Sequence, residues 1–396
     1  MPHHDPTPDR ALRFIGSLPP DVATTPSRAM GWVLDRIGGH SLTAMPCDPD
    51  ANWIVDYLQA AKQRPEVFAV VRPGAAVGPD GTVRPPAHDD GPPGYHLLPV
   101  FALRKGVRLR PEHVAMNRVA AVGQRVEALR RLRAERTELA GVRLQVSQPA
   151  PLDLAMFVFA GVAVEEGMPL RPMLRELRAV LTALRHLPVF REALLREMAE
   201  LHAAYGDELQ WQVESPVGQL LATKTAAFGL GRLGAWLVGG TLAAFLRAIP
   251  ADVDTTLHLC QGDYYNHELL APRSLKPAVR VLNRIGRSLG RRGRRLPQAH
   301  IPCACGSHPA PTQRQFYRPL RRLQQAWRLA AGVVSAADPD GSRVALALFE
   351  EESYRRAAAV ATGCGLGRDT AEEADAAVAV MRYVARHEDA LPAQAA

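Results

Sequence analysis

Short apolar runs alternate with longer amphipathic segments along nearly the whole chain, and this alternation constrains the fold more than any other feature. The amphipathic segments, such as Ser27–Ile37, Pro111–Arg136 and Pro172–His202, predict helices. Strand–helix alternation favours a parallel sheet covered by helices, and about eight such units predict a closed (β/α)8 barrel of the TIM type. The expected strands are Arg13–Leu18, Leu42–Pro46, Val142–Ser147, Leu209–Glu214, Thr255–Gln261, Ala299–Cys303, Val344–Phe349 and Val360–Cys364.

We expect this barrel to form a single domain over residues 1–396. Residues 73–95 are rich in Pro, Gly and Asp and predict an irregular insertion near the N-terminus, which is either a mobile flap or a disordered loop. An open doubly wound sheet is the alternative fold. No glycine-rich phosphate-binding fingerprint follows the first expected strand to support that alternative.

Composition and charge exclude several classes of protein. No apolar run reaches the roughly 18 residues needed to cross a membrane, and residues 1–5 do not resemble the start of a secretory signal. We therefore expect a cytoplasmic protein whose five cysteines are thiols. The formal net charge is +8, and six arginines lie between Arg284 and Arg295 without interleaved aromatic residues. This stretch predicts a solvated helix end, with polyanion binding as the alternative, and we expect no nucleic-acid partner.

Histidine and cysteine side chains follow two of the expected strands in the C-terminal third of the chain. Residues i and i+2 of a strand share one face, so His258 and Cys260 can point to the same place. Cys364 lies in a Gly-Cys-Gly loop, and Thr370 with Glu373 predicts a capping box that starts the next helix. Cys364 therefore belongs to a strand-to-helix loop, on the catalytic face of a barrel. Nitrogen and sulfur ligands together favour zinc.

These motifs resemble those of a known protein family. The His-x-Cys strand and the later Cys-Gly-Leu-Gly-Arg loop resemble the C-terminal catalytic barrel of cobalamin-independent methionine synthase. More broadly, the chain resembles the superfamily that also contains uroporphyrinogen decarboxylase and the zinc methyltransferases of methanogens, and is most similar to uncharacterised single-barrel bacterial members. The similarity spans residues 12–385 and includes Gly16-Ser17-Leu18-Pro19, Asn52-Trp53-Ile54-Val55, Leu98-Pro99-Val100-Phe101, Gln210-Trp211-Gln212-Val213-Glu214 and Leu257-His258-Leu259-Cys260-Gln261-Gly262-Asp263.

The resemblance implies a zinc ion (Zn2+) held by His258, Cys260 and Cys364. It also implies a glutamate ligand on the next strand, where this sequence has no acid and instead offers Cys303 and Cys305. Either cysteine can replace the missing ligand, or the fourth position is open. The implied activity is zinc-dependent methyl or alkyl transfer to a small-molecule thiol, which binds the metal as a thiolate.

Two departures leave other functions open. The acidic, glycine-rich run that related chains carry after the second strand is replaced here by residues 46–51, and the separate folate-binding barrel of methionine synthase is absent. The methyl donor and the acceptor are therefore not inherited from the resemblance. The alternatives are a metal-free lyase or decarboxylase of the uroporphyrinogen decarboxylase type and a non-catalytic binding member of the superfamily.

Several polar residues at strand ends are further candidates for the site. Asp263 and Glu214 are expected to bind substrate or to handle protons. A run of acids, Glu350–Glu352, follows the expected strand Val344–Phe349; such a run is usually solvated, and the alternative is that one of its carboxylates reaches the mouth of the barrel. Four more residues are expected to line the substrate pocket through hydrogen bonds: Gln145, Ser147, Gln148 and Gln212.

Overall fold

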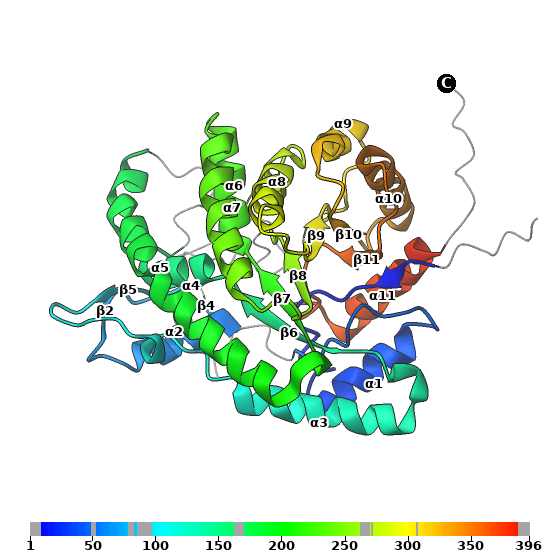
Figure 1. The fold of residues 1–396 in the computed structure, drawn as a ribbon, viewed down its shortest axis with the longest axis horizontal. Coiled ribbons are helices and arrows are strands. Elements are labelled where there is room, and N and C mark those ends of the chain that lie inside the picture. The colour runs from blue at the N-terminus through cyan, green and yellow to red at the C-terminus, as the bar shows by residue number, and fades with distance from the viewer. Residues whose placement is uncertain are drawn as a thin grey trace, which may run out of the picture.

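A parallel sheet of seven strands forms the centre of the molecule (Figure 1). The computed structural model describes residues 9–48, 53–77, 83–84, 97–161, 170–261, 270, 272–305 and 308–386. The strands follow the order β1-β11-β10-β9-β8-β7-β6, and every neighbouring pair is parallel. Their bounds are β1 Ala11–Leu12, β6 Leu144–Pro149, β7 Leu209–Glu214, β8 Thr255–His258, β9 Gln298–Pro302, β10 Arg328–Val334 and β11 Ala359–Thr362.

The segment between residues 41 and 48 closes this sheet into a barrel. It makes parallel bridges to β1 through Leu42 and to β6 through Met45. Further along, Ser17 also bridges to Asp48 in the parallel sense. This segment therefore takes the place of an eighth strand between β1 and β6. The predicted (β/α)8 barrel is confirmed.

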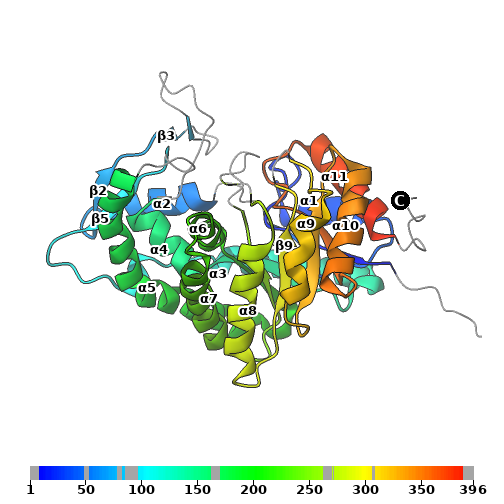
Figure 2. The same ribbon diagram turned by 90° about the horizontal axis from the view of Figure 1, so that it is seen from above.

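Helices surround the barrel, and Figure 2 shows them in sequence around it from α5 to α11. Side chains cap several helix starts: Thr25 caps α1, Asp338 caps α10, and Thr370 forms the predicted capping box with Glu373 at α11. The bounds are α1 Pro26–Arg36, α2 Trp53–Lys62, α3 Val119–Glu135, α4 Pro151–Phe159, α5 Leu170–Tyr205, α6 Pro216–Ala227, α7 Gly231–Ala248, α8 Lys276–Gly290, α9 Arg314–Tyr317, α10 Pro339–Ser353 and α11 Ala371–Ala385.

Two small antiparallel sheets lie outside the barrel. One pairs β2 (Phe68–Arg72) with β5 (Val100–Leu103), and the other pairs β3 (Ala76–Val77) with β4 (Val83–Arg84). The short β3–β4 pair falls inside the expected insertion 73–95. Residues 78–82 and 85–95 lie outside the described part of the chain, so the flap stays a prediction.

One expected strand is wrong and one strand was missed. Val344–Phe349 lies within α10, whereas the strand at this position of the barrel is β10, Arg328–Val334. The reason is physical: a short apolar run fits a buried strand and a buried helix face equally well. The capping aspartate Asp338, followed by Pro339, marks a helix start that the apolar run alone does not reveal.

The interior of this barrel is unusually polar. Barrel interiors are usually filled by branched apolar side chains. Here Arg13, Gln212, His258 and His300 are each at most 1% exposed. Buried polar groups need partners, so a network of hydrogen bonds is expected between the staves. Among the described helices, none combines the length and apolar character that a bilayer crossing requires.

Candidate metal centre

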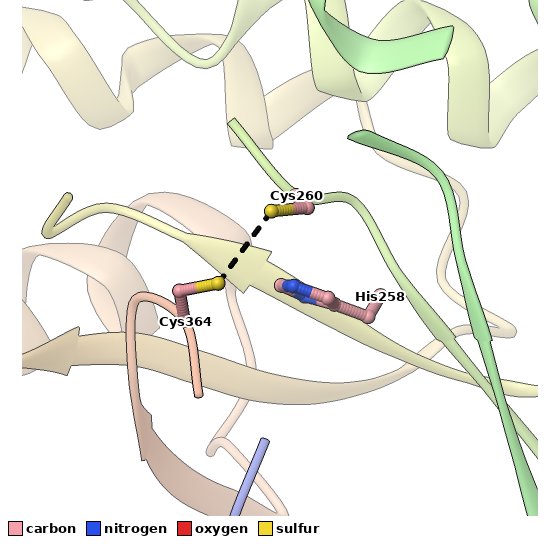
Figure 3. A group of neighbouring side chains, drawn as sticks. All are labelled: His258, Cys260 and Cys364. Carbon is pink, nitrogen blue, oxygen red and sulfur yellow. Dashed lines mark hydrogen bonds between the residues drawn. The ribbon is translucent and has the colours of Figure 1, made fainter. Parts of the chain in front are cut away.

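His258, Cys260 and Cys364 converge at the carboxyl end of the barrel (Figure 3). One potential ligand atom from each residue lies within 4.8 Å of the others. The sulfur atoms of Cys260 and Cys364 are 3.6 Å apart. His258 is the last residue of β8, and Cys364 follows β11, so the cluster joins two separate staves. The convergence expected from strand alternation is therefore present in the structure.

Glycines on both sides of Cys364 let its loop pack directly against neighbouring backbone. A Cβ atom added at Gly363 would lie 2.0 Å from the carbonyl oxygen of Ala304, and one at Gly365 would lie 2.6 Å from that of Ile15. Both distances are too short for any other residue without a shift of the backbone. The Gly-Cys-Gly sequence thus holds Cys364 at a fixed place above the barrel.

The surroundings of Cys364 favour its thiolate. The pKa of Cys364 lies well below its ordinary value, chiefly because the Cys260 thiol donates a hydrogen bond to it, with further contributions from His258 and Arg368. A guanidinium nitrogen of Arg368 is 4.0 Å from the Cys364 sulfur. The thiolate is the form of cysteine that binds metals.

His258 contacts a second histidine, His300, through its Nδ1 atom. The Nδ1 atoms of His258 and His300 are 2.7 Å apart, and Nε2 of His300 lies 3.1 Å from the carbonyl oxygen of Thr362. Burial lowers the pKa of His300 well below its ordinary value, so its ring is neutral. Nε2 of His258 is buried and has no hydrogen-bond partner among the described residues. It is the ring nitrogen that remains available to a metal ion.

Glu214 lies beside the cluster in a cavity of about 60 Å3 that His258, Cys260 and Cys364 also line. It is the residue of β7 that pairs in register with His258. Burial raises the pKa of Glu214 above its ordinary value. Its Oε1 accepts a hydrogen bond of 2.8 Å from Nε2 of Gln212. A carboxylate whose pKa is raised accepts a proton more readily than an exposed one does.

Gln212 in turn is oriented by a buried arginine. Arg13 donates hydrogen bonds of 2.8 Å to Oε1 of Gln212 and 2.7 Å to Oε1 of Gln210. Burial lowers the pKa of Arg13 to about 9, a value that leaves it a cation at neutral pH. Because its amide oxygen accepts from Arg13, Gln212 must present its amide nitrogen to Glu214.

The donor set suits a zinc ion. The cluster offers one imidazole nitrogen without a partner and two close sulfur atoms, one of them favoured as a thiolate. Zinc sites are usually four-coordinate and take such ligands. Three protein ligands with an open fourth position are typical of catalytic rather than structural zinc sites.

The other cysteines expected as ligands do not join this cluster within the described part of the chain. The sulfur of Cys303 is 3.7 Å from the carbonyl oxygen of Ile301, and burial raises its pKa above the ordinary range. Cys305 instead lines a neighbouring cavity of about 250 Å3, whose wall also includes Cys364. Neither sulfur is part of the cluster in this structure, so a ligand from this strand stays a prediction.

The expected pocket residues fall into different places. Ser147 lines the 60 Å3 cavity beside the cluster. Gln145 is buried, and its Oε1 has no hydrogen-bond partner in the described chain. Gln148 accepts a hydrogen bond of 2.5 Å from Arg118, which also pairs with Glu197 at 2.6 Å, so Gln148 belongs to a structural network.

The acidic candidates also separate. Asp263 lies outside the described residues. The expectation for Glu350–Glu352 is wrong because these residues belong to α10 and not to a strand end. Glu350 pairs with Arg10 at 2.6 Å, and Glu352 pairs with Arg321 at 2.7 Å. These carboxylates fix the helix to its neighbours.

Sequence reasoning missed two residues near the cluster, His300 and Arg13. His300 stands in register with His258 on the adjacent strand, and a polar residue at this point of an apolar run was a usable signal. Arg13 is likewise a charge inside the apolar run that precedes Gly16. A charged residue within an expected strand indicates a buried partner or a site.

Comparison with known proteins supports the fold. A B12-independent methionine synthase from Shewanella sp. W3-18-1, solved in complex with selenomethionine, is 12% identical with a TM-score of 0.50, over 95% of this chain and 97% of that chain. A putative vitamin-B12 independent methionine synthase from Listeria monocytogenes is 11% identical with a TM-score of 0.50, over 96% and 97%. No family model and no curated protein matches the sequence.

Proposed function

We propose that this protein transfers a methyl or other alkyl group to a small thiol substrate, with a zinc ion held by His258, Cys260 and Cys364. The observation that carries the proposal is the convergence of an unpartnered imidazole nitrogen and two sulfur atoms at the carboxyl end of a barrel. Active sites of such barrels lie at this end. The similarity in fold to B12-independent methionine synthases supports the same class of reaction.

The chemistry follows from the ligands and their neighbours. A bound zinc ion would lower the pKa of a substrate thiol that occupies the open position. In the reaction a sulfur–carbon bond forms and the bond between that carbon and its leaving group breaks, with the electron pair departing on the leaving group. Glu214 lines the same cavity with a raised pKa, and we assign it as the acceptor of the thiol proton.

Metal analysis tests this proposal directly. The purified chain is expected to contain about one zinc ion per molecule, as tetrahedral sites with these ligands do. Cys364→Ser should lose the zinc, whereas Cys47→Ser, which removes a buried thiol whose pKa burial raises to about 12, should keep it. A wild-type protein that remains free of metal after incubation with zinc would rule the proposal out.

Thiol binding tests the second half of the proposal. In the cobalt-substituted protein, a small thiol should add a sulfur-to-cobalt charge-transfer band, and its hydroxyl analogue should not. The comparison uses cysteine against serine and 2-mercaptoethanol against ethylene glycol. Equal spectra for the members of each pair would show that the open position does not accept a substrate thiol.

A further inference from the structure

His300 on β9 contacts the metal centre without belonging to it. Both of its ring nitrogens are engaged, Nδ1 with His258 at 2.7 Å and Nε2 with the carbonyl oxygen of Thr362 at 3.1 Å. His300 therefore has no lone pair left for an ion. The strand on which the resemblance implies an acidic ligand carries, at the position beside His258, a residue that can only act through its neighbour.

The hydrogen-bond partners fix where each proton lies. A carbonyl oxygen only accepts, so Nε2 of His300 must carry a proton. His300 is fully buried and its hydrogen-bond partners are an imidazole and a carbonyl, with no carboxylate among them, so its ring is neutral. A neutral imidazole has one proton, which leaves Nδ1 of His300 as an acceptor. Nδ1 of His258 must then donate across the 2.7 Å contact, and Nε2 of His258 keeps its lone pair. The orphaned buried nitrogen of the cluster is thus a consequence of this chain of contacts.

We propose that His300 is a positioning residue which, held by the carbonyl of Thr362, selects the tautomer of His258 that presents Nε2 to the ion between Cys260 and Cys364. This inference rests on the proposed function for its metal, but the tautomers themselves belong to the metal-free protein. The residues that orient a ligating histidine are usually carboxylates, carbonyls or water. Here the imidazole of His300 performs that role, and its own orientation is fixed by the backbone carbonyl of Thr362.

The same contacts connect β8 and β11, the two strands that position His258 and Cys364. Thr362 ends β11, and its hydroxyl donates a hydrogen bond of 2.6 Å to the carbonyl oxygen of Cys364. Thr362 therefore supports the Cys364 loop with its side chain and His300 with its backbone. The orientation of His258 and the position of Cys364 are coupled through one residue.

The fold also makes room for the second ring. A Cβ atom at Gly332 of β10 would lie 2.5 Å from Nε2 of His300 and 2.8 Å from the Cα of Pro302. Glycine at this position is what allows the imidazole to reach Thr362. The rings of His258 and His300 lie with centroids 4.8 Å apart and planes inclined by 43°.

Nitrogen NMR of the metal-free protein tests the tautomers. Histidine labelled with nitrogen-15 is introduced, and long-range proton–nitrogen correlations are assigned with His258→Leu and His300→Leu variants. We expect His258 as the Nδ1–H tautomer and His300 as the Nε2–H tautomer. An Nε2–H tautomer for His258 would overturn the inference, whether or not the protein binds zinc.

Metal affinity tests the consequence of the tautomer. His300→Leu should weaken zinc binding by about 10- to 100-fold, as loss of an orienting partner does at other zinc sites. His300→Asn retains an acceptor near the position of Nδ1 and should recover most of that loss. Gln298→Leu is the matched control, since it lies two residues earlier on β9, where its register partner is Thr256 and not His258. Competition with a chromophoric chelator gives the dissociation constants.

The outcomes separate the two proposals. If wild-type protein binds no zinc, the proposed function fails, and the tautomers are still decided by NMR. If wild-type protein binds zinc and folded His300→Leu binds it with equal affinity, the positioning role fails while the metal centre stands. Circular dichroism of the metal-free variants confirms that each is folded before its affinity is compared.

Discussion

At the scale of single residues, the most unusual feature of this protein is the polar interior of its barrel. Arg13 is fully buried, and its hydrogen bonds go to the neutral amides of Gln210 and Gln212 and to the hydroxyl of Thr43, not to a carboxylate. A buried cation is costly unless its donors are satisfied. The two amide oxygens and the hydroxyl of Thr43 accept from its Nη atoms, whereas its Nε has no hydrogen-bond partner in the described chain. The amide of Gln212 in turn donates to Glu214 beside the candidate metal centre.

Arg13→Met should lower the free energy of unfolding by about 1–4 kcal/mol, because two buried amide oxygens lose their donor. Urea denaturation at pH 7, followed by circular dichroism, measures the change. Arg328→Met is the matched control, since Arg328 is exposed at the start of β10, and its effect should stay within about 0.5 kcal/mol. Equal effects of the two changes would show that the buried network does not stabilise the barrel.

The sequence predicted the ligands of the cluster better than their surroundings. The two-residue period of an expected strand placed His258 and Cys260 on one face, and the two do converge, although β8 ends at His258 and Cys260 lies two residues beyond it. The loop of Cys364 was located by the capping box at Thr370. The period could not settle Cys303, because β9 ends at Pro302 and the following residues no longer alternate. The direction of a side chain beyond a strand end depends on tertiary contacts, which spacing does not encode.

At the scale of elements, α4 fixes the start of α6 and with it the end of β7. Asp153 of α4 is fully buried and accepts hydrogen bonds from the backbone N–H groups of Val217 and Gly218, at 2.6 and 3.3 Å. It also accepts from the hydroxyl of Ser215 at 3.2 Å. Ser215 directly follows Glu214, so this contact helps to set where β7 ends at the cavity.

The pH dependence of stability tests the state of Asp153. Burial raises its pKa from 3.8 to about 7, so between pH 4 and pH 7 the unfolded chain loses a proton that the folded protein retains. The stability of wild-type protein relative to Asp153→Asn should therefore fall as pH rises through this window, by up to about 4 kcal/mol. Urea denaturation at several pH values measures the difference.

Asp56→Asn on the exposed face of α2 is the control and should show no such trend. A difference that instead grows with pH would contradict the raised pKa. It would mean that the three donors around Asp153 stabilise the carboxylate more than burial destabilises it.

The sequence predicted helices and strands correctly where capping residues or alternating polarity marked their ends. It failed where an apolar run was the only signal. β7 has the expected bounds, because Leu209–Glu214 alternates between its two faces and Ser215-Pro216 ends it. β10 was missed because its apolar run does not alternate, as is usual for a strand buried on both sides. The helix α10 was mistaken for a strand because the apolar run Val344–Phe349 fits a buried strand as well as a buried helix face.

At the scale of the whole molecule, the barrel has a hollow at each end. The candidate metal centre lies at the carboxyl ends of the strands beside a cavity of about 60 Å3. A cavity of about 530 Å3 lies at the opposite end, where Gln210, Thr256 and Gln298 form part of its wall. The three candidate ligands, Glu214 with its raised pKa and the loop held by glycines are all at the smaller cavity, so chemistry and not volume favours it as the candidate site.

Zinc should stabilise the whole barrel in one cooperative step, because β8 and β11 are separate staves that only the folded chain brings together. At a free zinc concentration of about 100 times the dissociation constant, the gain is about 2.7 kcal/mol. For a chain of this length, that gain corresponds to a rise in Tm of about 3 °C. Differential scanning calorimetry of wild-type protein with zinc and with EDTA should show this shift in a single transition, and Cys364→Ser should not show it.

Two transitions, with zinc moving only one of them, would contradict the prediction of a single domain. A Tm that zinc raises equally in Cys364→Ser would show that the ion binds elsewhere.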